Sequence, residues 1–274
     1  MERIYNQMIL NNYYFYNDIK RWLFRKIVSF SMVFKKEIWL YYDCKGVEKD
    51  NGYYQFLHDV TKKDGIKRYF VTANNIKEAY KLFNNVSKKN VIKFNSIKHK
   101  LLYLKASKVI TAYIENNNCC PYTINSLKNY SDLFIKPQII YLQHGVLHAH
   151  MPWKFSFDRL LIDKEVISTK FEDNNLKRNY CFTDKHLIKA GMPRYDFISQ
   201  EEEPKNKILF APSWRRYLIG YNKGKWMPIE SKFIESSFFQ ETYKFLSSKK
   251  LHDLLEKYNF TLDFKLHPIF NCYK

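Results

Sequence analysis

Glycine and proline are scarce in this sequence, which has 7 of the first and 8 of the second in 274 residues. So few of them leave little room for flexible linkers or low-complexity tracts, and no internal repeat is found. Hydrophobic residues make up 46% of the chain, so it can bury a sizeable core and disorder is not the expected state. The length suits one large domain or two smaller ones.

Cysteine is also sparse, and the five that occur are odd in number and badly spaced for zinc. They are Cys44, Cys119, Cys120, Cys181 and Cys272. This pattern is typical of free thiols in a reducing cytosol. The chain opens on a polar, Asn- and Tyr-rich stretch, so no signal peptide is expected. We therefore predict a cytoplasmic protein.

Acidic residues are outnumbered, with 27 Asp and Glu against 46 Lys and Arg, and the formal net charge is +19. Such an excess favours an anionic partner: nucleic acid, a membrane surface, a phosphate polymer or a nucleotide. Compositional drift is the alternative, because Lys is abundant together with Asn, Ile and Tyr. No zinc-finger spacing or RNP-like stretch is present, so we predict no nucleic-acid partner.

No apolar run is long enough to cross a bilayer, which takes about 20 residues. Residues 19–36 instead place apolar side chains at helical spacing, with basic ones between and beside them. One interpretation is a segment lying on an anionic membrane surface. The other is an amphipathic helix docked on its own domain. The first predicts membrane contacts at Trp22, Arg21, Arg25 and Lys26.

From residue 37 onward, short apolar runs alternate with amphipathic stretches, which predicts an α/β fold with parallel sheets covered on both faces. The expected strands are Ile38–Tyr42, Lys67–Thr72, Lys108–Ile114, Ile139–Gln143, Arg159–Asp163, Lys207–Ala211 and Thr261–Leu266. The polar stretch from Gln200 to Lys207, which contains Pro204, is the expected linker. We predict a basic segment over 1–36, a first domain over 37–200 and a second domain beginning over 205–274.

Two stretches that follow expected strands in the first domain carry candidate chemistry. His144 and Gly145 end an apolar strand, and His suits proton transfer from a hydroxyl near neutral pH. Gly145 would allow a tight turn and close approach by a ligand. Further on, Gly191 and Pro193 shape a turn that fixes Arg194 and Asp196. A backbone-bonded histidine and a plain surface ion pair are the alternative interpretations.

Two similar stretches lie in the second domain. Ser213, Trp214 and Arg215 follow a strand that Pro212 ends, and a hydroxyl, a ring and a guanidinium there suit a phosphate-bearing ligand. His267 follows the last expected strand and precedes Pro268. A capped loop and a structural histidine are the alternatives. Ligands bind at the carboxyl ends of strands in open α/β sheets.

Taken in order, these stretches resemble the CDP-glycerol glycerophosphotransferase family. The resemblance rests on strand-His-Gly, Gly-x-Pro-Arg-x-Asp, Ile-Leu-x-Ala-Pro-x-Trp-Arg and a strand ending in His-Pro. Upstream, Asp50–Tyr53 and Phe94–Tyr103 are similar to the family's first domain. The likeness covers about residues 37–268. It implies a GT-B type fold with two Rossmann-like domains, the second one incomplete here.

The resemblance also implies a function. Members move glycerol phosphate from CDP-glycerol, or ribitol phosphate from CDP-ribitol, onto a lipid-linked acceptor at the cytoplasmic membrane face, building teichoic acid or capsule polymer. It implies His144 as general base, His267 steadying the leaving group, and Asp196 orienting a histidine or binding glycerol hydroxyls. Gly145, Arg194, Ser213, Trp214 and Arg215 are the expected substrate-binding residues. No Asp-x-Asp metal motif occurs, so neither a metal site nor a cofactor is assigned.

The chain departs from the family pattern at two points. Gln143 and Val146 flank His144-Gly145 where many members have Trp and Thr, so the acceptor can differ. The family continues past the His-Pro strand for roughly half a domain, whereas this sequence ends at Lys274. The alternatives are a nucleotide-sugar glycosyltransferase of the same fold, a non-catalytic remnant and a basic nucleic-acid-binding protein.

Overall fold

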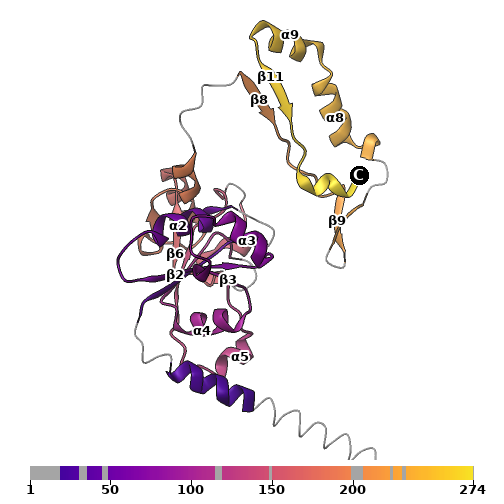
Figure 1. Cartoon of the computed structure of the whole chain (residues 1–274). Helices are drawn as coiled ribbons and strands as arrows, with labels where there is room; N and C mark the ends of the chain where they lie inside the picture. The colour runs from indigo at the N-terminus through magenta and orange to yellow at the C-terminus, as the bar shows by residue number, and fades with distance from the viewer. Residues whose placement is uncertain are drawn as a thin grey trace, which may run out of the picture. The chain divides into compact units, whose positions relative to one another are not determined.

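The protein is described by a computed structural model, which covers residues 19–30, 36–44, 49–114, 119–147, 150–198, 206–222, 225–229 and 233–273. The chain divides into two compact units, Met1–Ile198 and Ser199–Lys274 (Figure 1). The expected linker lies mostly outside the described residues. Each unit is considered by itself below.

The first unit is built on a seven-stranded, parallel sheet with the strand order β3-β2-β1-β4-β5-β6-β7. Its strands are β1 (Ile38–Tyr42), β2 (Lys67–Thr72), β3 (Val91–Lys93), β4 (Lys108–Thr111), β5 (Gln138–Tyr141), β6 (Lys164–Ile167) and β7 (Leu187–Lys189). Sequence order runs outward from β1 on one side and from β4 on the other. The carboxyl ends of β1 and β4 therefore sit where the strand order reverses, the usual place for a ligand in such sheets.

Alternate residues of each central strand pack on opposite faces of this sheet, because side-chain direction alternates along a strand. Tyr41 and Ile110 face α2 (Asn51–Val60) and α3 (Ile76–Leu82) in one cluster. Leu40 and Val109 join the other cluster with α4 (Ile97–Lys105). Burial on both faces explains why these strands read as continuous apolar runs in the sequence.

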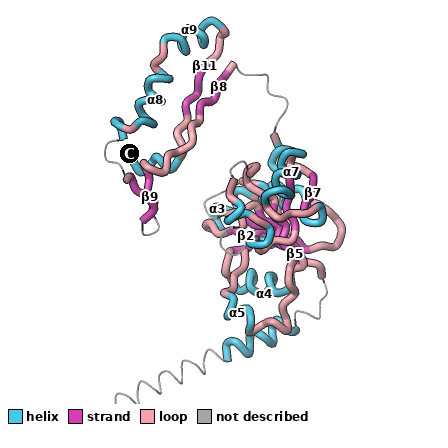
Figure 2. The backbone as a smooth tube through the Cα atoms, turned by 180° about the vertical axis from the view of Figure 1, so that it is seen from behind, coloured by secondary structure: helices cyan, strands magenta, loops and turns pink. Residues whose placement is uncertain are grey.

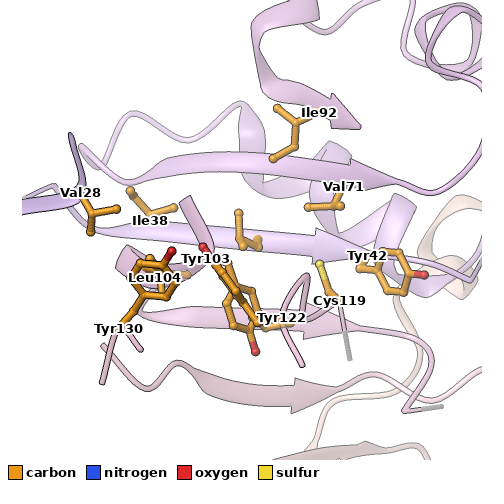
Figure 3. Close-up of a cluster of buried hydrophobic side chains, with 13 residues drawn as sticks. Val28, Ile38, Tyr42, Val71, Ile92, Tyr103, Leu104, Cys119, Tyr122 and Tyr130 are labelled. Atoms are coloured by element: carbon orange, nitrogen blue, oxygen red, sulfur yellow. The ribbon is translucent and has the colours of Figure 1, made fainter. Parts of the chain in front are cut away.

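A helix over residues 19–30 docks on the second of these clusters, beside α4 and α5 (Ile124–Lys128) (Figure 2). Its Val28 is fully buried and lies near Tyr130 and Leu104 (Figure 3). Arg25 pairs with Asp132 at 2.6 Å. The docked-helix interpretation is thus correct for one face of the helix, while its other face stays exposed.

The expected strand Arg159–Asp163 is wrong. Phe157–Arg159 form a short 3-10 helix, and β6 begins at Lys164. In the apolar run Leu160–Ile162 that suggested a strand, Leu160 and Ile162 pack in a core cluster, whereas Leu161 is exposed. Asp163 then leads into β6, with its carboxylate accepting a hydrogen bond from the Ile139 amide at 2.7 Å. The buried Glu165 within β6 hid this strand from a hydropathy pattern.

The second unit contains β8 (Lys207–Phe210) and β11 (Thr261–Phe264), which form a parallel pair, and the antiparallel pair β9 (Ile219–Asn222) and β10 (Lys225–Pro228). Its helices are α8 (Ser237–Leu246) and α9 (Lys249–Lys257). Ser247 is the C-cap residue of α8, and Ser248 is the N-cap residue of α9. Leu218, Ile219, Phe238 and Phe270 form its core.

Gly52 allows α2 to begin directly against the end of β1. A Cβ atom there would lie 2.5 Å from Asp43 Oδ1 and 2.7 Å from the Tyr42 carbonyl oxygen. We expect Gly52→Ala to lower the free energy of unfolding by about 1–3 kcal/mol, because the backbone must shift to relieve the overlap. Urea unfolding measures this, with Gly65→Ala as a comparison. Gly65 has open space but a φ of 80°, so its cost comes from backbone strain alone. An unchanged unfolding midpoint for Gly52→Ala would contradict the packing argument.

Candidate active site

His144 lies just past the carboxyl end of β5, and Arg194 holds the turn that carries it. Arg194 Nη1 donates hydrogen bonds to the His144 carbonyl oxygen at 2.9 Å and to Asp50 Oδ1 at 2.9 Å. The Arg194 amide donates to Asn51 Oδ1 at 3.1 Å, and Asn51 Nδ2 donates to the Gln143 carbonyl at 2.7 Å. The structure therefore brings the predicted His144 and Arg194 together through the start of α2.

The imidazole of His144 is oriented by two tyrosines. The Tyr113 ring stacks on it, with ring centroids 4.6 Å apart and an interplanar angle of 7°. Tyr141 Oη lies 3.5 Å from His144 Nδ1. The side chain of His144 is exposed, and no described side chain hydrogen-bonds its Nε2. In the tautomer in which Nδ1 carries the hydrogen and donates it to Tyr141 Oη, Nε2 can accept a proton from a hydroxyl.

The turn before His144 depends on Gln143, not on Gly145 as expected. Gln143 has a φ of 60°, in the left-handed region that disfavours side chains, whereas Gly145 does not. Its buried amide is anchored by donating to the Val166 carbonyl at 2.9 Å and to Glu172 Oε1 at 2.7 Å. These bonds offset the backbone strain. Gly145 has open space where a Cβ would stand, which leaves room for a ligand.

Glu172 belongs to α7 (Lys170–Asn179). Its neighbour Glu165 is a buried carboxyl, so its contribution to the free energy of unfolding depends on pH. Burial, and secondarily the Glu172 charge, raise the pKa of Glu165 to about 8. A raised native pKa contributes stability that is complete below the unfolded pKa near 4.5 and is lost as pH rises through about 8.

Glu165→Gln is therefore expected to unfold with a weaker pH dependence between pH 5 and 9. The wild-type chain should lose up to about 1.4 kcal/mol per pH unit from this group in that range. Urea unfolding of both proteins at several pH values is the measurement, with the exposed Glu78→Gln as the matched control. Parallel pH curves for wild type and Glu165→Gln would contradict the assignment.

The amino end of α2 is already occupied by a carboxylate of the chain itself. Asp43 Oδ1 accepts from the Gly52 amide at 3.0 Å, and its Oδ2 accepts from the amides of Tyr53 at 2.9 Å and Asp50 at 3.3 Å. Burial, followed by the Asp50 charge, raises the pKa of Asp43 to about 7 against these hydrogen bonds. A helix amino end commonly binds phosphate, and here Asp43 takes that place.

The remaining predicted residue of the first unit, Asp196, is exposed in the 3-10 helix Pro193–Phe197. Among the described carboxylates, Asp50 is the one that pairs with Arg194. The role given to Asp196 from the resemblance stays a prediction. No functional role was predicted for Asp50, Tyr113 or Gln143. A sequence signal for such a role came only from the Asp50–Tyr53 motif, which is part of the family resemblance.

The second unit places its predicted residues around the ends of β8 and β11. Arg215 follows β8 and lines a cavity of about 380 Å³ together with Ser237 and Phe238, the first residues of α8. Its guanidinium lies 5.3 Å from the Phe238 ring centroid and donates to the Ser213 carbonyl at 2.9 Å. Trp214 packs on the core of this unit. Exposed His267 follows β11, its Nδ1 accepting from the Ile269 amide at 3.2 Å.

In the part of the chain that the structure describes, no group of three or more His, Cys, Asp or Glu side chains is placed to hold a metal ion. The first unit thus offers an exposed imidazole, and the second, considered by itself, offers a guanidinium beside a helix amino end. These features define an α/β protein with candidate ligand sites at the carboxyl ends of parallel strands.

The chain belongs to the CDP-glycerol:poly(glycerophosphate) glycerophosphotransferase family, which matches residues 23–272. It is 30% identical over 258 residues to the minor teichoic acid biosynthesis protein GgaB of Bacillus subtilis (strain 168). That match covers 91% of this chain but 28% of GgaB. The resemblance seen in the sequence is confirmed.

Solved structures of the wall teichoic acid polymerase TagF share the fold. One TagF variant gives a TM-score of 0.54 at 12% identity, covering 88% of this chain and 58% of that one. Another, soaked with CDPG, gives 0.51 at 14% identity, covering 86% and 58%. The expected α/β fold of the GT-B type is thereby confirmed. The chain spans little more than half of TagF and under a third of GgaB.

Proposed function

We propose that this chain transfers glycerol phosphate from CDP-glycerol to a hydroxyl of a membrane-linked acceptor in the synthesis of teichoic acid or a capsule polymer. The observation that carries the proposal is the exposed imidazole of His144, fixed by Arg194 and stacked on Tyr113. An imidazole held in this way at a ligand-binding edge is placed to accept a hydroxyl proton. Membership of the glycerophosphotransferase family supports the transfer of glycerol phosphate as the class of reaction.

The first unit is proposed to present the acceptor. Its α2 amino end, where a nucleotide diphosphate would otherwise bind, is filled by the Asp43 carboxylate. A second anion there would face Asp43 and Asp50 at close range, which is unfavourable. The open space beside Gly145 and the exposed ring of His144 leave room for a hydroxyl-bearing chain instead.

The second unit is proposed to hold the donor. Arg215 and the start of α8 share one cavity, and a guanidinium beside a helix amino end suits a diphosphate. TagF has been soaked with CDPG, so a CDP-activated donor is consistent with the family. Ser213 supports this subsite by accepting a hydrogen bond from Arg215 at its carbonyl oxygen, and Trp214 does so by packing on the core. CDP-ribitol is the alternative donor.

In the proposed step, an acceptor oxygen forms a bond to the phosphorus that bears glycerol, and the bond from that phosphorus to the CMP oxygen breaks. His144 Nε2 takes the hydroxyl proton. His267 steadies the departing CMP, and Arg215 offsets the phosphate charge. Arg194 acts chiefly by fixing the His144 turn, because it already pairs with Asp50. Positioning and charge neutralisation supply most of the catalysis in phosphoryl transfer.

The membrane is proposed to be contacted through the helix over 19–30. Trp22, Leu23, Ile27 and Phe30 are exposed on it, with Arg21 and Lys26 between them. Arg25, predicted as a membrane contact, instead pairs with Asp132. No helix among the described residues is long and apolar enough to cross a bilayer. An exposed apolar stripe with flanking cations suits peripheral binding to an anionic leaflet, and the cytoplasmic face is the proposed location.

Replacing Trp22 and Ile27 together by serine is expected to weaken binding to phosphatidylglycerol vesicles by at least about tenfold, because two large side chains lose their burial in the lipid. Vesicle co-sedimentation measures this. Ile97→Ser, another exposed isoleucine on the first unit, is the matched control. Equal binding by the double variant and the control would contradict the assigned face.

The function is tested by incubating the protein with CDP-glycerol, CDP-ribitol or UDP-glucose and a lipid-linked acceptor. CMP release with one CDP-polyol and not with UDP-glucose supports the proposal. Turnover of UDP-glucose alone would favour a nucleotide-sugar glycosyltransferase. No heat of binding with CDP-glycerol in titration calorimetry would favour a non-catalytic remnant.

A further inference from the structure

A cavity of about 350 Å³ lies at the edge of the first unit's sheet opposite to His144. Its walls come from the end of α4, from α5, and from the segments that lead into β5 and β6. The apolar wall residues include Tyr103, Tyr122, Leu127, Phe134, Ile139 and Leu160. Ile139 lies near the amino end of β5, whereas His144 lies past its carboxyl end. This cavity is therefore separate from the site of proton transfer.

Apart from Lys136, the side-chain polar groups discussed for the wall are engaged by the protein. Tyr122 Oη donates to the Lys100 carbonyl at 3.0 Å, and Cys120 Sγ donates to the Tyr122 carbonyl at 3.5 Å. The Asp163 carboxylate accepts from the Ile139 amide at 2.7 Å. A polar ligand that entered the cavity would lose its hydrogen bonds to water and find few protein groups to replace them. A hydrocarbon makes no such hydrogen bonds and so needs no replacement.

The cavity lies near the helix over 19–30. The ring centroid of Phe24 in that helix is 5.4 Å from that of Tyr130, and the Tyr130 centroid is 5.7 Å from that of Tyr122 in the cavity wall. Tyr103 and Tyr122 belong to the same packed cluster as Val28 of that helix (Figure 3). Leu161, in the cavity wall, is 73% exposed, and Ile135, next to the wall residue Lys136, is 46% exposed. Exposed apolar side chains thus lie beside the cavity, and Lys136 of its wall adds an exposed cation.

We propose that this cavity binds one hydrocarbon chain of an anionic membrane phospholipid, with Lys136 close to the phosphate. The occupant follows from the apolar wall, the adjoining cation and the shared cluster with the lipid-facing helix. The assignment rests on the proposed membrane placement of that helix. It adds a second mode of attachment: the helix lies on the leaflet, while a single lipid chain enters the protein. The lipid would anchor the unit with its His144 edge turned away from the bilayer.

Titration calorimetry of the whole chain with dodecyl phosphate, below its critical micelle concentration, and with butyl phosphate tests the proposal. Each buried methylene adds about fourfold to affinity, so dodecyl phosphate should bind at least about 100-fold more tightly. Leu127→Trp fills the cavity and should remove most of that gain. Leu254→Trp, at an exposed position on α9, should retain it. Equal affinities for the two phosphates, no binding of either, or equal binding by the two variants would overturn the proposal.

Alkylation by iodoacetamide, read by peptide mass spectrometry, locates the binding. Cys120 lines the cavity and is partly exposed, while Cys181 is exposed elsewhere. Dodecyl phosphate should slow the labelling of Cys120 and leave that of Cys181 unchanged. If both thiols are affected equally, the amphiphile binds outside the cavity and the assignment fails. Neither assay uses vesicles or CDP-glycerol, so a failure here is distinguishable from failure of membrane binding or of transfer.

Discussion

Replacing His144 by alanine is expected to slow transfer from CDP-glycerol by about 10²–10⁴-fold, the usual contribution of a general base. The reason is geometric. The His144 side chain is exposed, its Nδ1 lies 3.5 Å from Tyr141 Oη, and its ring stacks on Tyr113. Alanine removes the proton acceptor but keeps the backbone carbonyl to which Arg194 donates. CMP release under saturating donor and acceptor is the measurement.

Two controls separate chemistry from folding in that experiment. His58→Ala changes an exposed histidine on α2 and should retain wild-type turnover. The unfolding midpoint of His144→Ala should stay close to wild type, because its side chain is exposed and contributes little to the core. Turnover within a few-fold of wild type would remove His144 from the role of base. A large drop in stability would mean that the histidine supports the turn.

The central strands were predictable because both faces of the sheet are covered. Residues 38–42 and 68–72 are buried or half-buried throughout, and the strands were predicted at the observed bounds, 38–42 and 67–72. The edge of the sheet was harder to predict. Glu165 interrupts the apolar pattern of β6, and Leu160–Ile162 is apolar without being a strand. β7 spans three residues, which is too short to stand out in a hydropathy pattern.

The site was predictable only in part, because only some of its residues carry a local sequence signal. His144 and Arg194 follow a strand and a Gly-Pro turn, and both signals are local. Asp50 and Tyr113 gain their roles from contacts with residues far along the chain, Asp50 with Arg194 and Tyr113 with His144. The Asp43 carboxylate that fills the amino end of α2 is recognisable only once burial and the three amide donors are known.

Replacing Arg194 by alanine is expected to lower the free energy of unfolding of the first unit by about 3 kcal/mol and to slow transfer as well. Arg194 is 31% exposed but its partner Asp50 is 6% exposed, so the variant leaves a carboxylate buried without its cation. The hydrogen bond to the His144 carbonyl is lost together with it. Urea unfolding followed by tryptophan fluorescence is the measurement, and three of the five tryptophans, Trp22, Trp39 and Trp153, lie in the first unit.

The pair Arg194→Ala and Asp50→Asn distinguishes the ion pair from simple packing. If the buried charge causes the loss, adding Asp50→Asn to Arg194→Ala should recover part of the stability, because the unpaired carboxylate is then gone. Turnover should not recover, since the His144 carbonyl still lacks its donor. Strictly additive stability losses would contradict the ion-pair account. Recovery of turnover in the double variant would show that Arg194 does not position the histidine.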